Sequence, residues 1–157
     1  TGGKTSSLMF GIQWDLTCKF LETKGGLSQE EVKGGDEIGS TNWGNYSNST
    51  IFLSQGKYNT SPNNSNSQWL DITSGAKSGT MLLTTGASEN TKKMNIYDFA
   101  GNVYEWTLET DTSGTNSPCA NRGGSCNVHG SDYPASYHNS NLTTGSYNDV
   151  GIRPSLI

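Results

Sequence analysis

The sequence has few charged residues and no long apolar run. Charged residues make up 15% of the 157 residues, the formal net charge is −4, and the basic residues are scattered, which argues against a nucleic-acid-binding surface. No apolar run approaches the roughly 20 residues that a transmembrane helix requires, so we expect no membrane insertion. The chain does not begin with methionine or a signal-peptide pattern, and we interpret it as the C-terminal part of a longer protein.

Cysteine and histidine are also scarce. The chain has three cysteines and two histidines, with no CxxC pair and no Cys/His cluster at zinc-ligand spacing. Cys18 lies in an apolar helical pattern and is predicted to be buried. Cys119 and Cys126 could form a disulfide bond or stay free, and the sequence does not decide between the two. A GxSxG motif is absent as well, so no serine nucleophile is indicated.

Glycine, serine, asparagine and aromatic residues are abundant instead. Twenty glycines predict many turns and little regular structure. The apolar share is only 31%, but four tryptophans, seven tyrosines and four phenylalanines compensate because each ring buries a large area. We therefore predict one loop-rich domain over residues 1–157, large enough to bury a core.

One long helix is predicted over residues 8–21. Thr5, Ser6 and Ser7 offer N-cap oxygens, and Gly25 with Gly26 supplies a stop. Its expected buried stripe repeats at every fourth position and contains Leu8, Ile12, Leu16 and Phe20, widened by Met9 and Trp14.

The rest of the chain is predicted to hold short elements. Ser28 and Glu31 form a capping-box pattern that starts a second short helix. Residues 35–79 are expected to be ordered and loop-rich, pinned by Trp43, Tyr46, Phe52, Tyr58 and Trp69. Strands are predicted at residues 80–85, 103–109, 122–126 and 147–154.

Residues 95–106, which we call the aromatic turn, read NIYDFAGNVYEW. Asp98 and Glu105 stand among aromatic residues, where polar groups are unfavourable unless they are satisfied. A bend at residues 100–102 followed by a strand would bring both carboxylates near backbone carbonyls. That arrangement suits a hard cation.

Three motifs in order resemble the formylglycine-generating-enzyme (sulfatase-modifying factor) family: the aromatic turn, NRGGSC at residues 121–126 and NDVGIRP at residues 148–154. The resemblance implies an α+β, C-type-lectin-like fold. It also implies a structural Ca²⁺ ion, held by the carboxylates of Asp98 and Glu105 and the carbonyl oxygens of Gly101 and Val103. The alternative for Glu105 is hydrogen bonding to backbone amides in a buried corner.

The catalytic members of that family bind copper through two cysteines that follow the GGS motif. The matching places here fall near Val128 and Tyr133, and neither is cysteine. A single thiol at Cys126 could not reproduce a two-thiolate site, so we expect no copper and no enzyme activity. The alternative is a formylglycine-generating-enzyme-like oxidoreductase or another enzyme on the same fold.

Residues 126–149, which we call the display segment, favour recognition. They contain no Glu, Lys, Arg, Gln, Met or Trp and are crowded with Tyr, Ser, Asn and Gly, as in antibody binding loops. The alternative is a plain polar loop. The expected aromatic anchors are Tyr133, Tyr137 and Tyr147. The other expected binding residues are Cys126, Asn127, Val128, His129, Asp132, His138, Asn139, Asn141, Asn148 and Asp149.

The display segment also resembles the variable part of diversity-generating retroelement proteins, a bacterial or phage branch of this fold. There, mutagenesis at the adenines of asparagine codons yields Asn, Ser, Thr, Tyr, His, Asp, Gly, Cys, Val, Ile or Leu, but not Glu, Lys, Gln, Met or Trp. The resemblance implies that residues 121–153 are a variable ligand-binding region. It further implies a protein or glycan partner on a cell surface, and an extracellular, cell-surface or virion location.

Overall fold

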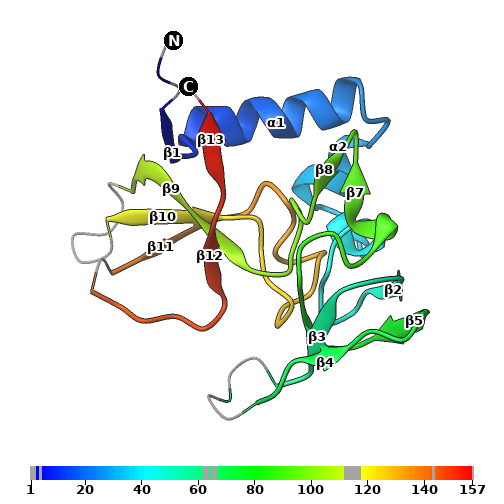
Figure 1. Cartoon of the computed structure of the whole chain (residues 1–157). Coiled ribbons are helices and arrows are strands. Elements are labelled where there is room, and N and C mark those ends of the chain that lie inside the picture. The colour runs from blue at the N-terminus through cyan, green and yellow to red at the C-terminus, as the bar shows by residue number, and fades with distance from the viewer. Residues whose placement is uncertain are drawn as a thin grey trace.

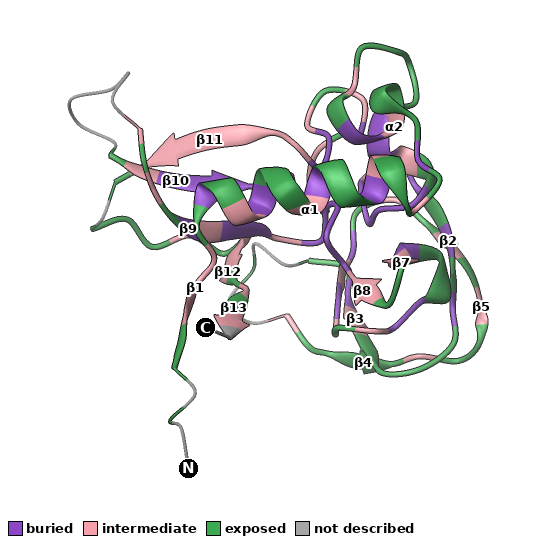
Figure 2. Cartoon of the chain, turned by 90° about the horizontal axis from the view of Figure 1, so that it is seen from above, coloured by how far each residue is buried: buried purple, intermediate pink, exposed green. Residues whose placement is uncertain are grey.

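The helix α1 (Gly11–Thr23) lies across one face of a four-stranded sheet, as Figures 1 and 2 show. The structure, a computed structural model, describes residues 3, 5–61, 64, 67–111, 118–142 and 144–156. The helix begins after Phe10, whose backbone N–H donates to Oε1 of Gln13 at 2.9 Å. It ends where the N–H groups of Lys24 and Gly25 both donate to the Phe20 carbonyl. The predicted position of the helix is confirmed, and Gly25 and Gly26 follow its end as predicted. The predicted N-cap residues are wrong, because residues 6–8 form a strand.

The face of α1 that packs on the core is not the predicted stripe. Ile12, Leu16 and Phe20 are 66%, 61% and 40% exposed. Trp14 is buried instead, with its ring stacked 4.1 Å from that of Phe99. Buried Cys18 and Leu21 continue that face. The Trp14 ring decides which face of α1 packs on the core, because it buries more area than any single aliphatic side chain.

The second helix, α2 (Gln29–Lys33), has the predicted capping box. The backbone N–H of Ser28 donates to Glu31 Oε2 at 2.8 Å, and the backbone N–H of Glu31 donates to Ser28 Oγ at 3.1 Å. Gly34, with φ of 74°, ends the helix, as expected for a residue that tolerates positive φ. Two 3₁₀ helices are η1 (Gly39–Asn42) and η2 (Glu89–Thr91).

The four-stranded sheet has the order β11-β10-β9-β12. Its antiparallel strands are β9 (Tyr104–Thr110), β10 (Cys119–Arg122) and β11 (His138–Asn141), and β12 (Val150–Ile152) runs parallel to β9. The predicted strand at 103–109 is confirmed as β9. The strand predicted at 122–126 is displaced to β10, because residues 123 and 124 are glycines with positive φ that turn the chain away.

The remaining strands are short. The pair β1 (Ser6–Leu8) and β13 (Pro154–Leu156) joins the two ends of the chain. The others are β2 (Thr50–Leu53) with β5 (Gly75–Ser78), β3 (Lys57–Asn59) between β4 (Leu70–Asp71) and β6 (Leu82–Leu83), and β7 (Lys92–Lys93) with β8 (Ile96–Tyr97). Only two residues of the strand predicted at 80–85 are in β6.

Buried side chains form two apolar clusters. One gathers around Trp14, Trp43, Tyr46 and Phe99, between α1, α2 and the neighbouring loops. The other lies among the small sheets and includes Ile51, Leu53, Met81 and Leu83. Few helices and open sheets make the architecture α+β.

The aromatic anchors predicted for residues 35–79 are only partly confirmed. Trp43 and Tyr46 are buried, but Phe52 and Trp69 are largely exposed. Residues 62, 63, 65 and 66 of this tract lie outside the described part of the chain. Within the part that is described, no helix has the length and apolar character needed to cross a membrane.

Candidate functional site

The aromatic turn bends between β8 and β9, as the sequence predicts. Asp98, Gly101 and Asn102 have φ of 52°, 71° and 65°. A Cβ at Gly101 would lie 2.2 Å from the carbonyl oxygen of Asn45, so only glycine fits there. The amide of Asn45 also donates to Oδ1 of Asn102 at 2.9 Å. The bend is therefore locked to a loop that lies far away in the sequence.

Both carboxylates of the aromatic turn have protein partners. Arg153 binds Glu105 with two hydrogen bonds, Nε to Oε2 at 2.6 Å and NH2 to Oε1 at 2.7 Å. Burial raises the pKa of the Glu105 carboxyl, and the guanidinium opposes that rise. Asp98 accepts hydrogen bonds from Thr91 Oγ1 at 2.7 Å and from the backbone N–H of Gly86 at 2.9 Å. Each of the four carboxylate oxygens thus has a donor.

This donor set does not fit calcium in the observed conformation. The guanidinium of Arg153 supplies the positive charge beside Glu105, and it also donates to the carbonyl oxygens of Tyr97 and Asp98. A cavity of about 280 Å³ adjoins the pair and is lined by Val103 and Gly151 among others. The residues that the structure describes contain no group of three or more His, Cys, Asp or Glu side chains able to hold a metal ion. Calcium binding at Asp98, Gly101, Val103 and Glu105 stays a prediction. The Glu105 carboxylate accepts hydrogen bonds from Arg153, not from backbone amides as the alternative supposed.

The glycine pair that precedes the display segment is built into the core. Gly123 and Gly124 have φ of 93° and 73°. A Cβ at Gly123 would lie 2.9 Å from the Trp14 ring, and one at Gly124 would lie 2.4 Å from the carbonyl oxygen of Tyr133. The Tyr46 hydroxyl donates to the Gly123 carbonyl at 3.1 Å. The display segment therefore starts from a fixed point.

The strand register assigns side chains to the two faces of the sheet. Directly opposite residues share a face. Asn121 of β10 lies opposite Trp106 of β9 and Asn139 of β11, and Ile152 of β12 lies opposite Trp106. The adjacent row, which contains Arg122, faces α1. We call the face that carries Trp106 the outer face.

Aromatic rings gather on the outer face. The rings of Tyr104 and Tyr137 are 6.3 Å apart, those of Tyr133 and Tyr137 are 4.7 Å apart, and those of Trp106 and Tyr147 are 6.0 Å apart. Residues 144–149 run past the sheet on the side away from α1 (Figure 1). The three predicted aromatic anchors thus meet two rings that the prediction missed. The alternation of Tyr104 and Trp106 with polar neighbours along β9 was the signal for them.

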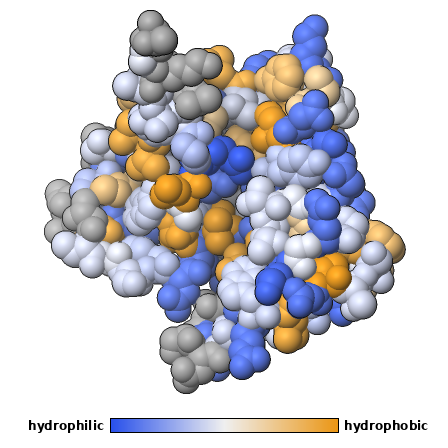
Figure 3. Space-filling view, in the orientation of Figure 1, coloured by the Kyte–Doolittle hydropathy of each residue, from blue (hydrophilic) through white to orange (hydrophobic). Residues whose placement is uncertain are grey.

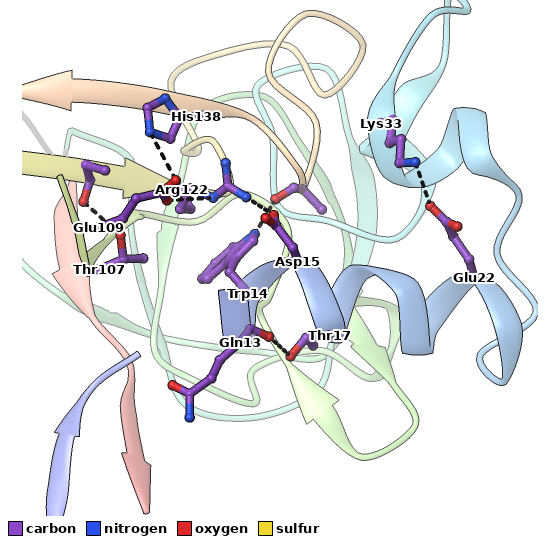
Figure 4. A network of polar contacts seen from close by, with 12 residues as sticks. Gln13, Trp14, Asp15, Thr17, Glu22, Lys33, Thr107, Glu109, Arg122 and His138 are labelled. Carbon is purple, nitrogen blue, oxygen red and sulfur yellow. Dashed lines mark hydrogen bonds and ion pairs between the residues drawn. The ribbon is translucent and has the colours of Figure 1, made fainter. Parts of the chain in front are cut away.

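His138 points to the other side of the sheet. Register pairs it with Arg122, and its Nε2 lies 3.8 Å from Glu109 Oε1 (Figure 4). Arg122 also forms an ion pair with Asp15 of α1. His138 therefore lies on the face of the sheet opposite the aromatic rings, and its role in binding stays a prediction. Successive residues of a strand alternate between faces, so Asn139 and Asn141 remain on the outer face while His138 does not.

Burial separates the other predicted binding residues. Cys126 is fully buried, and its backbone N–H donates to the carbonyl of Asn102, so it cannot contribute to an exposed surface. Burial raises the pKa of its thiol to about 12. Val128 packs against the core cluster around Trp14. His129, Asp132 and Asn148 are exposed, and Asn127, Asn139, Asn141 and Asp149 are half-buried.

Asn121 is a buried polar residue that the prediction missed. It is fully buried between two strands, and neither its Oδ1 nor its Nδ2 has a protein partner within hydrogen-bond distance. A buried amide left without partners is unfavourable by about 1–3 kcal/mol. Its place beside Trp106 and Asn139 puts an unused donor and acceptor next to the aromatic rings of the outer face.

Two of the three thiols, Cys18 and Cys126, are buried. Cys18, Cys119 and Cys126 are all free, so the possible bridge between the last two is not formed. Burial raises the pKa of the Cys18 thiol to about 12 as well. Val128 and Tyr133, at the copper-binding places of the catalytic relatives, carry no thiol.

Comparison with known families agrees with the three motifs. Residues 12–155 match the family described as "Sulfatase-modifying factor enzyme 1-like domain". The chain belongs to this family. The comparisons with curated proteins and with solved structures return no match. The family is thus established over nearly the whole chain, including the aromatic turn and the display segment.

Proposed function

We propose that this sulfatase-modifying-factor-like domain binds a ligand without catalysis, through the outer face of its four-stranded sheet. The observation that carries the proposal is the gathering of Tyr133, Tyr137 and Tyr147 with Tyr104 and Trp106. Tyrosine and tryptophan give large, rigid contact areas at small loss of conformational entropy, and each can also form a hydrogen bond.

Polar groups around the rings add adaptable hydrogen bonding. Asn139 and Asn141 lie on the outer face, and the unpartnered amide of Asn121 lies between the rings and β11. Apolar atoms, shown in orange, gather near β12 in a mainly hydrophilic surface (Figure 3). A shallow face with aromatic rings and amides suits a protein or glycan ligand better than a small molecule, which needs a deep pocket.

The residues at the copper-binding places of the family favour binding over this family's enzyme activity. A copper site of the family type needs two thiolates, and the matching residues Val128 and Tyr133 cannot supply them. The buried thiols of Cys18 and Cys126 are protonated at neutral pH, which disfavours metal ligation. An oxidoreductase of the same fold is the second candidate, and an assay with Cu(I), oxygen and a cysteine-containing peptide tests it: we expect no oxygen consumption above buffer.

Within this proposal, the domain has a C-type-lectin-like fold and is a variable protein of a diversity-generating retroelement from a bacterium or phage. The support is that fixed positions, such as Gly123 and Gly124, are sterically locked, whereas exposed positions such as His129, Asp132 and Asn148 carry residues reachable from asparagine codons. Residue 143 of the proposed variable region lies outside the described part of the chain. The domain then works outside the cell, on a cell surface or on a virion.

The genomic test is a search beside the gene. We expect a near-copy of the coding segment for residues 121–153 that differs mainly at adenines, next to a reverse-transcriptase gene. Absence of both from the complete locus would overturn the retroelement assignment and leave ligand binding standing.

The binding test uses the purified domain on a glycan array and on intact bacterial cells, read by fluorescence. We expect specific binding that is lost in the variant Tyr133→Ala/Tyr137→Ala/Tyr147→Ala. The matched control is Tyr97→Ala, a half-buried tyrosine of β8 in the aromatic turn, whose hydroxyl donates to Glu89 rather than lying among the outer-face rings. Binding that survives the triple substitution would place the ligand elsewhere and overturn the proposed surface.

A further inference from the structure

Residues 144–149, which we call the strap, run past the outer face between β11 and β12 (Figure 1). Four of the six residues are exposed. Among the described residues, the backbone hydrogen bonds of the strap lie at its two ends. The N–H of Gly145 donates to the carbonyl of Leu142 at 3.3 Å, and the carbonyl of Asp149 accepts from the N–H of Tyr104 at 2.8 Å. A segment with so few internal contacts requires little free energy to open.

A ring contact holds the middle of the strap against the sheet. The Tyr147 ring lies edge-on to the Trp106 ring, with 6.0 Å between the two centroids. The hydroxyl end of Tyr147 lies over Gly145, because a Cβ built on that glycine would be 2.2 Å from Tyr147 Oη. The absence of a side chain at Gly145 therefore lets the tyrosine lie across its own backbone and reach Trp106.

The row of the outer face that contains Trp106 also contains the amide without partners. Asn121 lies directly opposite Trp106 and is fully buried, and neither its Oδ1 nor its Nδ2 has a partner among the described residues. An amide both accepts and donates, so the closed arrangement leaves two groups unsatisfied, which is unfavourable. The ring contact thus favours the closed strap, and the buried amide opposes it.

We propose that Tyr147 is a latch that holds the strap closed over Trp106, and that the ligand binds after the strap opens. The proposal rests on the proposed function, since the outer face is the binding surface in both. Opening frees both rings for the ligand and lets a polar group reach the Asn121 amide. That group must itself donate and accept hydrogen bonds, as a hydroxyl or an amide does. Because the ligand binds the open form, a variant with more of that form binds more tightly.

The variant Gly145→Ala tests the latch without any ligand. Its Cβ would meet the hydroxyl end of Tyr147, a terminal group that moves when the side chain rotates, so the ring should leave Trp106. We expect amide hydrogen exchange in the strap to become at least roughly tenfold faster. Gly75→Ala is the matched control, because neither glycine has a positive φ and a Cβ at Gly75 meets no atom beyond its chain neighbours closer than 4.0 Å.

Tryptophan fluorescence follows the same ring contact. In a Trp69→Phe background, Trp106 is the tryptophan that acrylamide can quench, because the other two are buried. Gly145→Ala should raise its quenching constant. Tyr147→Ala should do the same, and adding Gly145→Ala to it should change nothing further, because the added Cβ acts through the tyrosine ring.

The variant Asn121→Leu should shift the strap in the opposite direction. Leucine removes the unsatisfied amide that opposes closure, so hydrogen exchange in the strap should slow relative to wild type. Circular dichroism checks that the variant is folded. Asn121→Val, which is smaller and also lacks the amide, serves if leucine is too large for the site.

Binding to intact bacterial cells tests the consequence for the ligand. Gly145→Ala should bind more tightly than wild type, and Gly75→Ala should bind equally. Unchanged exchange in Gly145→Ala, a further effect of that substitution in the Tyr147→Ala background, faster exchange without the Asn121 amide, or no gain in binding from an opened strap would each overturn the proposal. Exchange and quenching need no ligand, so they decide on the latch even where the binding tests overturn the proposed function.

Discussion

In the aromatic turn, polar side chains are bound by the protein itself, whereas in the display segment most of them meet solvent. Asp98 and Glu105 have a donor for every carboxylate oxygen. Asp132 and Asn148 are exposed. The two regions use similar residue types, so composition alone does not separate a structural polar group from a binding one.

The difference lies in the backbone that carries each region. Residues of the aromatic turn hold positive φ angles and touch loops from distant parts of the sequence, which leaves almost no freedom for substitution. The display segment is fixed at its start by the glycine pair and at β11 by the sheet, and its loops carry exposed side chains such as His129, Asp132 and Asn148. A rigid frame with tolerant loops is the usual arrangement of binding domains.

Removing Arg153 should have the largest effect on the frame. Arg153→Ala leaves the Glu105 carboxylate buried without its partner, and breaking such a pair lowers the free energy of unfolding by about 3–5 kcal/mol. Urea unfolding followed by tryptophan fluorescence measures the loss. Arg153→Ala/Glu105→Gln removes the buried charge as well and should recover part of it. Equal stability of Arg153→Ala and wild type would contradict the importance of this pair.

A matched pair of tyrosine substitutions should separate the two regions by about 3 kcal/mol. Tyr46→Ser removes a fully buried ring and its hydrogen bond to Gly123, whereas Tyr147→Ser removes a half-buried ring that contacts Trp106 at the outer face. We expect a large loss of unfolding free energy for the first variant and less than about 1 kcal/mol for the second. Comparable losses would show that the display segment supports the fold as much as the core does.

Alkaline pH should weaken the frame through its buried thiols. Burial raises the pKa of Cys18 and Cys126 to about 12, whereas an unfolded thiol titrates near about 8.5. The thiols therefore stay protonated to higher pH in the folded state than in the unfolded state. Their contribution to the free energy of unfolding is complete below the unfolded pKa and is lost as the pH rises toward 12. Between pH 8 and 10, each thiol should remove about 2 kcal/mol from the free energy of unfolding.

Urea unfolding at pH 8, 9 and 10 measures this slope. The variant Cys18→Ala/Cys126→Ala should show a shallower decline, because only buried tyrosines such as Tyr46 and Tyr104, whose pKa values are also raised by burial, would remain to contribute. A slope unchanged by the double substitution would mean that these thiols ionise in the folded protein.

The sequence predicted where α1 lies but not which face it buries. Apolar residues occur both at Ile12, Leu16 and Phe20 and at Trp14, Cys18 and Leu21. The 3.6-residue period therefore supports two orientations. Phe99 settles the choice through its stacking on Trp14, and that contact joins residues 85 positions apart. Only tertiary structure contains this information.

The candidate site was predicted only in part, because the missing part also depends on tertiary structure. Composition identified Tyr133, Tyr137 and Tyr147, because binding loops favour tyrosine. It could not place Tyr104 and Trp106 beside them, since that depends on strand register. Register also places His138 on the opposite face of the sheet, and the fold places Arg153 on Glu105 across 48 residues.

The smallest expected effect is that of calcium. Both oxygens of Glu105 are bound by Arg153, and both oxygens of Asp98 accept hydrogen bonds, so an ion would have to displace a guanidinium that is already satisfied. We expect the melting temperature of the wild-type domain to be the same in millimolar CaCl₂ and in EGTA. In Arg153→Ala the freed carboxylate is negative and buried, so calcium should raise the melting temperature of that variant. A calcium-dependent rise in the wild type would instead show that the ion competes with Arg153, and would support the ligand set that the family resemblance implies.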